Sequence, residues 1–171
     1  MCKKYEKIFL VGMPGCGKTT MGKVLAKELN YNFYDMDEYI EEISGRSIKD
    51  LFSESEEVFR TWETEACSRL REKKRSVIST GGGVVKRDEN IKLLKDSGLV
   101  VFINRPVEKI IEDVDINSRP LLTAGKERIY ALYEERFDRY KQICHVEIVN
   151  EGFIRDTIDN IKKEIRGKVK E

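Results

Sequence analysis

The chain has 171 residues, of which 37% are charged and 40% hydrophobic, and its formal net charge at pH 7 is +1. A length of roughly 100–200 residues suits one domain that buries its own core. The near balance of basic and acidic side chains argues against a protein that coats nucleic acid or an anionic membrane. We therefore expect a single globular domain, residues 1–171, with no nucleic-acid or membrane partner.

The cysteine and histidine content excludes several kinds of site. Cys2, Cys16, Cys67 and Cys144 are far apart and form no C-x-x-C pair, and His145 is the only histidine. A zinc site needs clustered ligands, and a Ser-His-Asp or Cys-His site needs a histidine beside its nucleophile. The apolar run near the N-terminus is too short for a signal peptide or a spanning helix. We expect a cytoplasmic protein with reduced thiols, in which carboxylates perform any acid–base chemistry.

Five short apolar runs rich in β-branched residues alternate with longer amphipathic stretches. The runs that predict β-strands are Ile8–Val11, Asn32–Tyr34, Val77–Thr80, Leu99–Ile103 and Val146–Val149. The clearest predicted helices are Lys18–Leu29, Glu56–Lys74, Val107–Val114, Lys126–Ile143 and Phe153–Ile165. Strands that alternate with helices predict a parallel sheet with helices on both faces. Ligands are then expected at the carboxyl ends of the strands.

The first predicted strand is followed by G-M-P-G-C-G-K-T at 12–19, which fits the phosphate-binding pattern G-x-x-x-x-G-K-[ST]. The glycines let successive backbone N–H groups converge on an anion, and the following helix adds the positive end of its dipole. Lys18 is expected to reach the β- and γ-phosphates, and the Thr19 hydroxyl to ligate Mg²⁺. Cys16 is expected to be a small filler rather than a redox thiol.

Two carboxylates, Asp35 and Asp37, follow the second predicted strand. At positions i and i+2 they point the same way from the strand end. One can hold Mg²⁺ directly or through water, and the other can accept a hydrogen bond, and the proton, from a substrate hydroxyl. An alternative role for Asp37 is the N-cap of the helical stretch Glu38–Ser44, and the two roles are compatible.

Arg60 and Glu63 lie one turn apart on the predicted helix Glu56–Lys74, and by themselves they favour a surface ion pair of little energetic weight. The third strand leads into S-T-G-G-G at 79–83. Three consecutive glycines expose backbone N–H groups and allow close approach of a ligand. Because this loop ends a strand beside the phosphate loop, a ligand site is favoured over a merely flexible loop, with Ser79 able to hold a metal-bound water.

A polar segment with proline and glycine, N-S-R-P-L-L at 117–122 followed by T-A-G-K, separates two predicted helices. Such a loop can close as a flap. Arg119 on it could stabilise the charge of a transferring phosphoryl group, and closure would exclude water. A second arginine, Arg136, lies on the next helix in Y-x-x-R-x-x-x-Y at 133–140.

Taken together, these motifs resemble shikimate kinase over about residues 5–165. The resemblance is carried by G-x-x-G-x-G-K-T, D-x-D at 35–37, G-R-S-I-x-D-L-F at 45–52, F-R-x-x-E at 59–63, T-G-G-G at 80–83, R-P-L-L at 119–122 and the arginine helix around Arg136. The phosphate loop alone is generic, whereas this conjunction in this order is specific. The resemblance implies the P-loop NTPase fold of nucleoside monophosphate kinases, with a five-stranded parallel sheet in three α/β/α layers. It also implies a substrate-binding subdomain at about 36–64 and a mobile lid at about 114–126.

The same resemblance implies a monomeric enzyme that uses ATP and Mg²⁺ to phosphorylate the 3-hydroxyl of shikimate, in the biosynthesis of chorismate and aromatic amino acids. Two arginines that converge on one small molecule suit its carboxylate. The residues implied to bind ATP are Gly12, Gly15, Cys16, Gly17, Lys18, Thr19, Thr20 and Arg119. Those implied to bind shikimate are Asp37, Arg60, Glu63, Gly81, Gly82, Gly83 and Arg136. Lys18, Asp37 and Arg119 are implied to be catalytic, and Thr19 and Asp35 to hold Mg²⁺.

The chain departs from the family pattern on the adenine side. Where many relatives carry a basic residue, residues 112–115 are acidic except for a valine, and no basic residue stands at 150–153. The alternatives within enzymes are kinases of the same fold that act on gluconate or a nucleoside monophosphate. A non-catalytic nucleotide-binding protein is disfavoured because Lys18 and Asp37 are both present, and a GTPase because N-K-x-D is absent.

Overall fold

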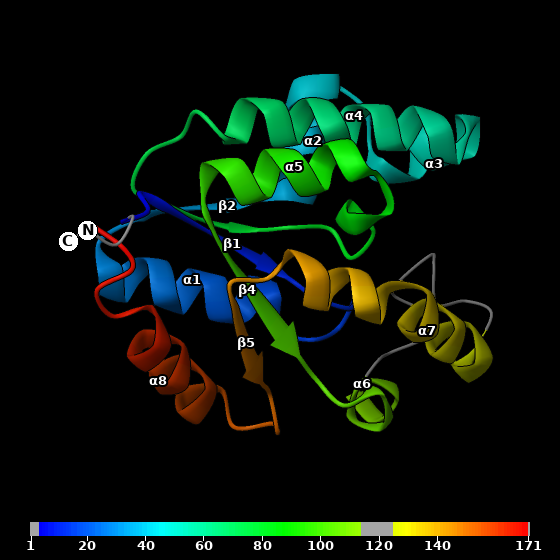
Figure 1. Ribbon diagram of the computed structural model, residues 1–171. Coiled ribbons are helices and arrows are strands. Elements are labelled where there is room, and N and C mark those ends of the chain that lie inside the picture. Colours follow the sequence, from blue (N-terminus) through cyan, green and yellow to red (C-terminus); the bar gives the residue numbers. More distant parts are fainter. Residues whose placement is uncertain (1–3, 114–124, 171) are drawn as a thin grey trace.

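The structure, a computed structural model, describes residues 4–113 and 125–170. Its centre is a five-stranded parallel sheet in the order β2-β3-β1-β4-β5 (Figure 1). The strands are β1 (Lys7–Val11), β2 (Asn32–Asp35), β3 (Ser76–Ser79), β4 (Leu99–Asn104) and β5 (Val146–Val149). Each predicted strand agrees with an observed one to within one residue at either end, and the predicted α/β class is confirmed.

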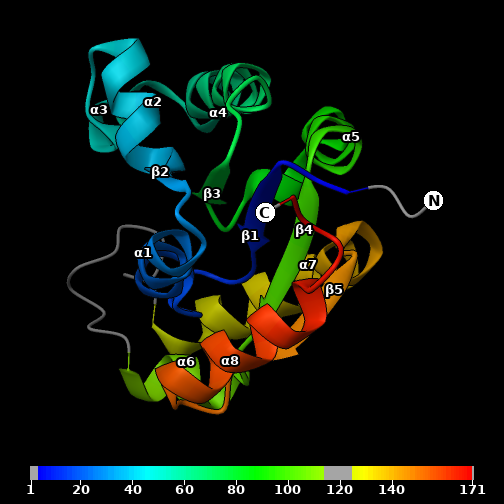
Figure 2. The same cartoon turned by 90° about the vertical axis from the view of Figure 1, so that its left-hand side faces the viewer.

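Helices cover both faces of the sheet. They are α1 (Lys18–Leu29), α2 (Met36–Ser44), α3 (Ile48–Glu54), α4 (Glu56–Leu70), α5 (Asp88–Ser97), α6 (Val107–Asp113), α7 (Lys126–Ile143) and α8 (Ile154–Ile165), with a short 3₁₀ helix, η1 (Val84–Lys86). α1 and α8 lie on one face, and α4, α5 and α7 lie on the other, which gives three layers (Figures 1 and 2). In Figure 2, α2 and α3 stand beyond the edge strand β2.

The three central strands form the core of the molecule. All residues of β1 and β3, and all but the last residue of β4, are buried. Their side chains are mostly valine, isoleucine, leucine and phenylalanine, as expected for parallel strands that helices cover on both faces. Each such side chain stabilises the fold by about 1.5–3 kcal/mol when it is fully buried. The carboxyl ends of these strands are therefore firmly held supports for the loops that follow them.

Thr80 fixes the start of the loop after β3. Its backbone N–H and its hydroxyl both donate to the carbonyl oxygen of Leu10, at 3.1 and 2.8 Å. Leu10 lies on β1, immediately before the phosphate loop. Two hydrogen bonds to one carbonyl thus hold the glycine triplet of residues 81–83 beside the phosphate loop.

The junction between β2 and α2 differs from the prediction. The carboxylate of Asp35 accepts hydrogen bonds from the backbone N–H groups of Asp37 and Glu38, at 3.0 and 3.3 Å, so Asp35 is the N-cap and the helix begins at Met36. The prediction that Asp37 caps a helix starting at Glu38 was wrong. Because the cap comes two residues earlier, Asp37 lies in the first helical turn, where its charge interacts favourably with the helix dipole.

α4 ends at Leu70, four residues before the predicted end at Lys74. Residues 71–75 are all charged and offer no apolar side chain that would continue the buried stripe. Arg75 has a left-handed φ of 45°, which an α-helix cannot include. α3 and α5 were not among the predicted helices, and α3 spans only seven residues, too few for a clear period. No helix in the described parts of the chain has the length and apolar character needed to cross a membrane.

The predicted helix 107–114 is present as α6, and α7 begins at Lys126 as predicted. Residues 114–124, which include Arg119 and most of the predicted lid, lie outside the described residues. Near the two ends of the chain, Tyr5 donates its N–H to Lys168 at 2.8 Å and accepts from the N–H of Lys170 at 2.9 Å (Figure 1). The division into a core, a substrate-binding part and a lid stays a prediction.

Ser55 joins α3 to α4 and is the N-cap of α4, since its hydroxyl accepts from the N–H of Val58 at 3.1 Å. We expect Ser55→Ala to lower the free energy of unfolding by about 1 kcal/mol, the usual effect of losing a serine cap. Urea unfolding followed by circular dichroism measures this. The matched control is Ser53→Ala, because the Ser53 hydroxyl bonds only within α3 to the Lys49 carbonyl. Equal losses in the two variants would contradict the capping role.

Candidate active site

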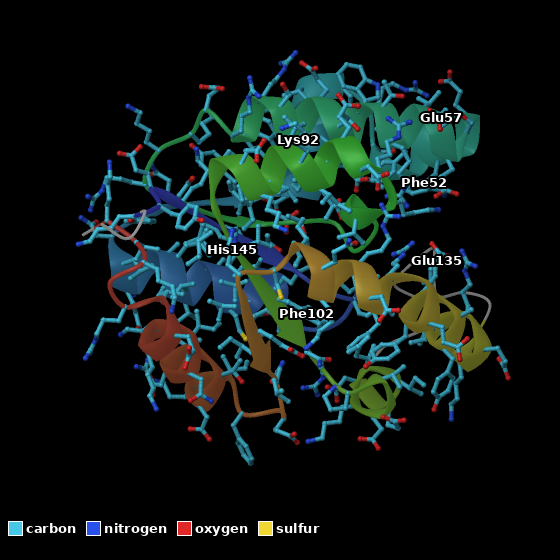
Figure 3. All side chains as sticks on the ribbon, viewed as in Figure 1. Phe52, Glu57, Lys92, Phe102, Glu135 and His145 are labelled. Atoms are coloured by element: carbon cyan, nitrogen blue, oxygen red, sulfur yellow. The ribbon has the colours of Figure 1, made fainter. Side chains whose placement is uncertain are left out.

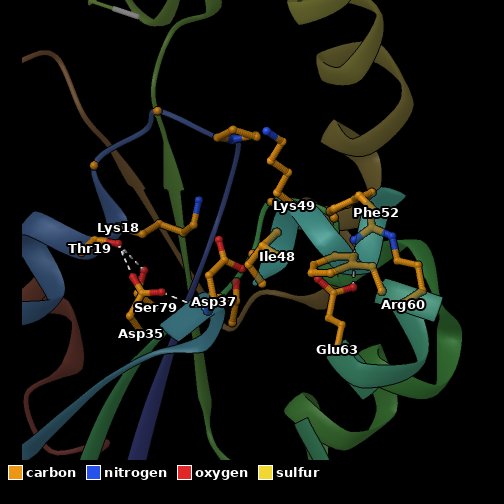
Figure 4. Close-up of a pocket in the computed structure, with 18 of the residues that line it drawn as sticks. Lys18, Thr19, Asp35, Asp37, Ile48, Lys49, Phe52, Arg60, Glu63 and Ser79 are labelled. Carbon is orange, nitrogen blue, oxygen red and sulfur yellow. Dashed lines mark hydrogen bonds and ion pairs between the residues drawn. The ribbon is translucent and has the colours of Figure 1, made fainter. Parts of the chain in front are cut away.

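A cavity of about 690 Å³ opens at the carboxyl ends of β1, β2 and β3. Its walls come from the phosphate loop, the first turn of α1, the start of α2, α3, α4 and the glycine triplet. Figure 4 shows Lys18, Thr19 and Asp35 on one side of this cavity, and Phe52, Arg60 and Glu63 on the other, with Asp37 between them. The predicted motifs after the first three strands therefore meet around one space, as the topology of a parallel sheet requires.

The phosphate loop adopts its bent shape through three glycines with positive φ, Gly12, Gly15 and Gly17. The ammonium group of Lys18 is buried and donates to the carbonyl oxygens of Gly12 and Met13, at 2.8 and 2.9 Å. The loop thus holds its own lysine at the wall of the cavity. Of the predicted nucleotide-binding residues, Gly15, Gly17, Lys18, Thr19 and Thr20 line the cavity.

Cys16 is a packing residue of this loop. A Cβ atom on Gly12 would lie 2.8 Å from the Cys16 sulfur, and the Lys18 ammonium lies 3.6 Å from that sulfur. The Cys16 carbonyl accepts from the side chain of Asn150, at 3.0 Å. The thiol is fully buried, so the expectation of a small filler fits its surroundings.

Three side-chain oxygens gather beside the phosphate loop. The Thr19 hydroxyl donates to Asp35 Oδ2 at 2.8 Å and lies 3.2 Å from the Ser79 hydroxyl (Figure 4). Mg²⁺ prefers such oxygen ligands and keeps several waters, so one or two protein groups beside phosphates suffice. Within residues 4–113 and 125–170 no group of three His, Cys, Asp or Glu side chains could hold a metal by itself. The donor set therefore fits a Mg²⁺ ion that is held jointly with phosphate.

Arg60 is the principal cation on the opposite wall, and it is only 5% exposed. Its Nη1 donates to Glu63 Oε1 at 2.9 Å, and its Nε and Nη2 both donate to Glu56 Oε1 at 3.2 Å. Its guanidinium also lies over the Phe59 ring, 5.0 Å from the centroid. A guanidinium has five N–H donors, one on Nε and two on each Nη. One N–H on Nη1 and one on Nη2 therefore remain, and this pair matches a carboxylate.

Glu63 is fully buried, so the residues alone were misleading in favouring a surface pair with Arg60. Burial raises the pKa of the Glu63 carboxyl, against the lowering effect of the Arg60 charge. Its Oε2 atom has no hydrogen-bond partner among the described residues. An ion pair in this position costs desolvation energy and orients its members more than it stabilises the fold. In this geometry Glu63 fixes the position of Arg60 Nη1.

Each glycine of the triplet leaves room for a neighbouring group. A Cβ on Gly81 would lie 3.0 Å from Glu63 Oε2 and 3.5 Å from Asp37 Oδ1. A Cβ on Gly82 would lie 2.6 Å from Cδ of Pro14, and one on Gly83 would lie 2.6 Å from Cζ of Arg60. The triplet was predicted because ligands approach bare backbone, but the structure adds a second reason. Three protein side chains already occupy the positions that Cβ atoms would take.

Arg136 and Tyr140 lie one turn apart on α7 and are almost completely buried. The Tyr140 hydroxyl donates to the Gly82 carbonyl, and its ring stacks on Phe102 with 5.2 Å between centroids. Burial raises the pKa of the Tyr140 hydroxyl, so it stays a donor. The Nε and Nη1 atoms of Arg136 have no hydrogen-bond partner among the described residues. Arg136 is not among the residues that line the cavity, but it retains these unused donors.

Sequence reasoning missed the apolar wall and Tyr140. Ile48, Phe52 and Phe59 line the cavity from α3 and α4, and the two phenylalanine rings stack at 4.2 Å. The signal was present, because G-R-S-I-x-D-L-F and F-R-x-x-E contain these three residues. Tyr140 ends the pattern Y-x-x-R-x-x-x-Y, but nothing in that pattern predicts a contact with Gly82.

The loop after β5 bonds to the phosphate loop through Asn150 and Cys16. Its basic neighbours come from other segments of the chain. The guanidinium of Arg105, which follows β4, donates to the Asn150 carbonyl at 3.4 Å and pairs with Asp113. Lys109 on α6 pairs with Glu151. Two of the acidic residues in these segments, Asp113 and Glu151, therefore have basic partners, one directly after β4 and one on α6.

A parallel sheet with a phosphate loop after its first strand, facing a buried arginine across one cavity, defines a P-loop kinase of small molecules. A gluconokinase from Sinorhizobium meliloti has the same fold, with a TM-score of 0.63 and 16% identity over 96% of this chain and 98% of that one.

A family model described as shikimate kinase matches residues 14–166, and the chain belongs to the shikimate kinase family. A shikimate kinase of Clostridium botulinum, strain Alaska E43, is 54% identical over 94% of this chain and 97% of its own length. One from Clostridium beijerinckii is 45% identical over 94% of this chain and 95% of its own. The structure of the Acinetobacter baumannii shikimate kinase in complex with shikimate matches with a TM-score of 0.90 and 34% identity, covering 98% of this chain and 97% of that one.

The bond from Tyr140 to Gly82 can be tested by removing one atom. We expect Tyr140→Phe to keep the stacking on Phe102 but to lower the free energy of unfolding by about 1–2 kcal/mol, because a buried carbonyl loses its donor. The control is Tyr133→Phe on the same helix, whose half-buried ring stacks on Phe137. Urea titrations of the three proteins give the comparison, and a Tyr140→Phe curve that overlies the wild-type curve would contradict the assignment.

Proposed function

We propose that this chain transfers the γ-phosphoryl group of ATP to the 3-hydroxyl of shikimate, giving shikimate 3-phosphate and ADP. The observation that carries the proposal is the buried guanidinium of Arg60, which keeps two N–H donors for a carboxylate across the cavity from the phosphate loop. Shikimate has one carboxylate and a ring of hydroxyls. With the carboxylate on Arg60, the hydroxyls would face the phosphate loop, which is the arrangement that transfer requires.

The nucleotide half of the reaction would use the phosphate loop. Its N–H groups and the N-terminus of α1 would bind the phosphates, and Lys18 would exchange its two loop carbonyls for phosphate oxygens. Thr19 and Asp35 would hold Mg²⁺, which would supply positive charge to offset that of the phosphates. Arg119, outside the described residues, would close over the same phosphates from the proposed lid.

The acceptor half would use Asp37, Arg60, Glu63, the glycine triplet and Arg136. Asp37 lies between the two walls (Figure 4) and would accept a hydrogen bond from the attacking hydroxyl. A loose transition state requires little proton removal early, so orientation of that hydroxyl would be the main contribution of Asp37. Arg136 would add its unused donors to those of Arg60.

The remaining parts of the proposal concern the whole molecule. We propose one kinase domain with a substrate-binding part at about 36–64 and a lid at about 114–126, acting as a monomer. The described cysteines, Cys16, Cys67 and Cys144, are free thiols. Free thiols are usual for proteins in a reducing compartment, which supports the cytoplasm as its location.

A panel of acceptors tests the proposed reaction. With Mg²⁺ and ATP, we expect the purified chain to release ADP in a coupled assay when shikimate is added, and not with gluconate or AMP. The reason is the wall around Arg60, where a cation that suits a small carboxylate lies beside the stacked rings of Phe52 and Phe59. Turnover of gluconate or AMP in place of shikimate would overturn the substrate assignment.

We expect Arg60→Ala to weaken shikimate binding by about 100-fold while the affinity for ATP changes less than about threefold, because a charge-assisted fork to a carboxylate contributes about 2–5 kcal/mol when buried. Isothermal titration calorimetry with each ligand measures both affinities. Arg60→Lys keeps the charge without the fork, and it should lose most of the same affinity.

The matched control for these variants is Arg69→Ala. Arg69 lies on the same helix and pairs with Glu65 at 2.6 Å on the exposed surface. An unchanged shikimate affinity in Arg60→Ala would show that the carboxylate binds elsewhere.

A further inference from the structure

The Glu56 carboxylate holds one edge of Arg60 and is itself held by a lysine from a different element. Its Oε1 atom accepts from Arg60 Nε and Nη2, both at 3.2 Å, and from the ammonium of Lys86 at 2.7 Å. Lys86 is the last residue of η1, which directly follows the glycine triplet. One oxygen therefore joins the triplet segment to the arginine on α4.

We propose that Lys86 is a positioning residue for acceptor binding, which acts through Glu56 to keep the Arg60 guanidinium oriented and available to a carboxylate. This inference rests on the proposed function, because it concerns the group that Arg60 would bind. Lys86 is absent from the lining of the cavity, so it would not touch the acceptor itself.

Charge balance gives the first argument. Arg60 contacts two carboxylates, Glu56 and Glu63, so its single positive charge is already more than matched. A substrate carboxylate would be a third anion beside one cation, and like charges repel one another. The ammonium of Lys86 offsets the charge of Glu56 directly. The hydrogen bond from Lys86 is also the largest cause of the lowered pKa of the Glu56 carboxyl, which therefore stays ionised.

Geometry gives the second argument. Glu56 engages the Nε edge of the guanidinium, so the two N–H groups that remain belong to Nη1 and Nη2. The Glu56 side chain is half exposed, and without Lys86 it would be free to take other rotamers. Arg60 would then lose one of the two carboxylates that fix the rotation of its plane.

Lys86 also faces the helix that carries the second arginine. Its ammonium lies 4.0 Å from Glu135 Oε1, and that oxygen lies 3.7 Å from Nε of Arg136. Glu135 is on α7, which packs against η1 (Glu135 is labelled in Figure 3). Lys86 thus lies near the carboxylates beside both proposed substrate arginines, but its hydrogen bond is to Glu56, and its effect is therefore expected through Glu56.

A purely structural role for Lys86 predicts a different result. Its side chain is 33% exposed, and ion pairs at such positions contribute about 0–1 kcal/mol to stability. A tether between α4 and η1 would therefore shift the melting temperature slightly and affect both substrates alike. A positioning role would instead affect the acceptor alone.

The experiment measures kcat and KM for shikimate and for ATP in Lys86→Met, Lys86→Glu and Lys86→Arg. We expect the shikimate KM to rise about fivefold in Lys86→Met and further in Lys86→Glu, whereas Lys86→Arg stays within about twofold of wild type. The kcat and the KM for ATP should not change in any of them. Lys92→Met is the matched control, because Lys92 forms an exposed ion pair with Asp96 on α5 (Figure 3).

The double variant Glu56→Gln with Lys86→Met tests the route. If Lys86 acts through Glu56, its shikimate KM equals that of Glu56→Gln alone; if the two effects add, Lys86 acts on the substrate directly and the inference is wrong. It is also wrong if Lys86→Met and Lys86→Glu keep the wild-type shikimate KM, or if both KM values rise together with a fall in melting temperature.

These failures differ from a failure of the proposed function. Wild-type KM values in the Lys86 variants, with shikimate affinity lost in Arg60→Ala, would refute the role of Lys86 alone. Absence of shikimate phosphorylation by the wild-type chain would refute the function.

Discussion

Burial of the Arg60 guanidinium is the constraint on which one whole wall of the cavity depends. A cation removed from water needs partners inside the protein, and the loss of either carboxylate would leave an unbalanced charge. The fold meets this need from a single helix, since Glu56, Arg60 and Glu63 lie on successive turns of α4. The aromatic rings of Phe52 and Phe59 cover the group from the side. Hence the placement of α4, rather than any single contact, decides where the proposed carboxylate site lies.

The opposite wall of the cavity depends on backbone groups instead of a buried side chain. There the side chains are few, and the backbone of the phosphate loop supplies the polar groups, held in shape by three glycines with positive φ. Lys18 and Thr19 bond to protein oxygens that phosphate and metal would replace. One wall is thus suited to a compact carboxylate and the other to a triphosphate, and Asp37 stands where they meet (Figure 4).

Much of this could be predicted from the sequence, and the reason is that the informative signals are local. The phosphate loop is a contiguous pattern, the bounds of α1 and α7 follow from their periodicity, and the parallel order follows from alternation of strands and helices. The carboxyl-edge rule then brings the motifs together. Local signals could not show how deeply a side chain is buried. The i,i+3 pair of Arg60 and Glu63 looks the same in sequence whether it is exposed or buried, and only packing against the glycine triplet distinguishes the two.

Two contacts that were not predicted join residues far apart in the chain. Tyr140 bonds to Gly82, and Lys86 to Glu56, across 58 and 30 residues. The N-cap of α2 is Asp35 and not Asp37, because the position of the helix cap depends on how β2 leaves the sheet. Such details depend on tertiary distances of a few tenths of an ångström, which no spacing in the sequence encodes.

The contact between Pro14 and Gly82 has a consequence for how such proteins diverge. The proline ring of the phosphate loop lies where a Cβ atom on Gly82 would be, so the two loops touch with no Gly82 side chain between them. A bulkier residue at either position would push the loops apart and lengthen the path for phosphoryl transfer. The two segments are therefore obliged to vary together, and a chimera that takes one loop from a distant relative must take its counterpart as well.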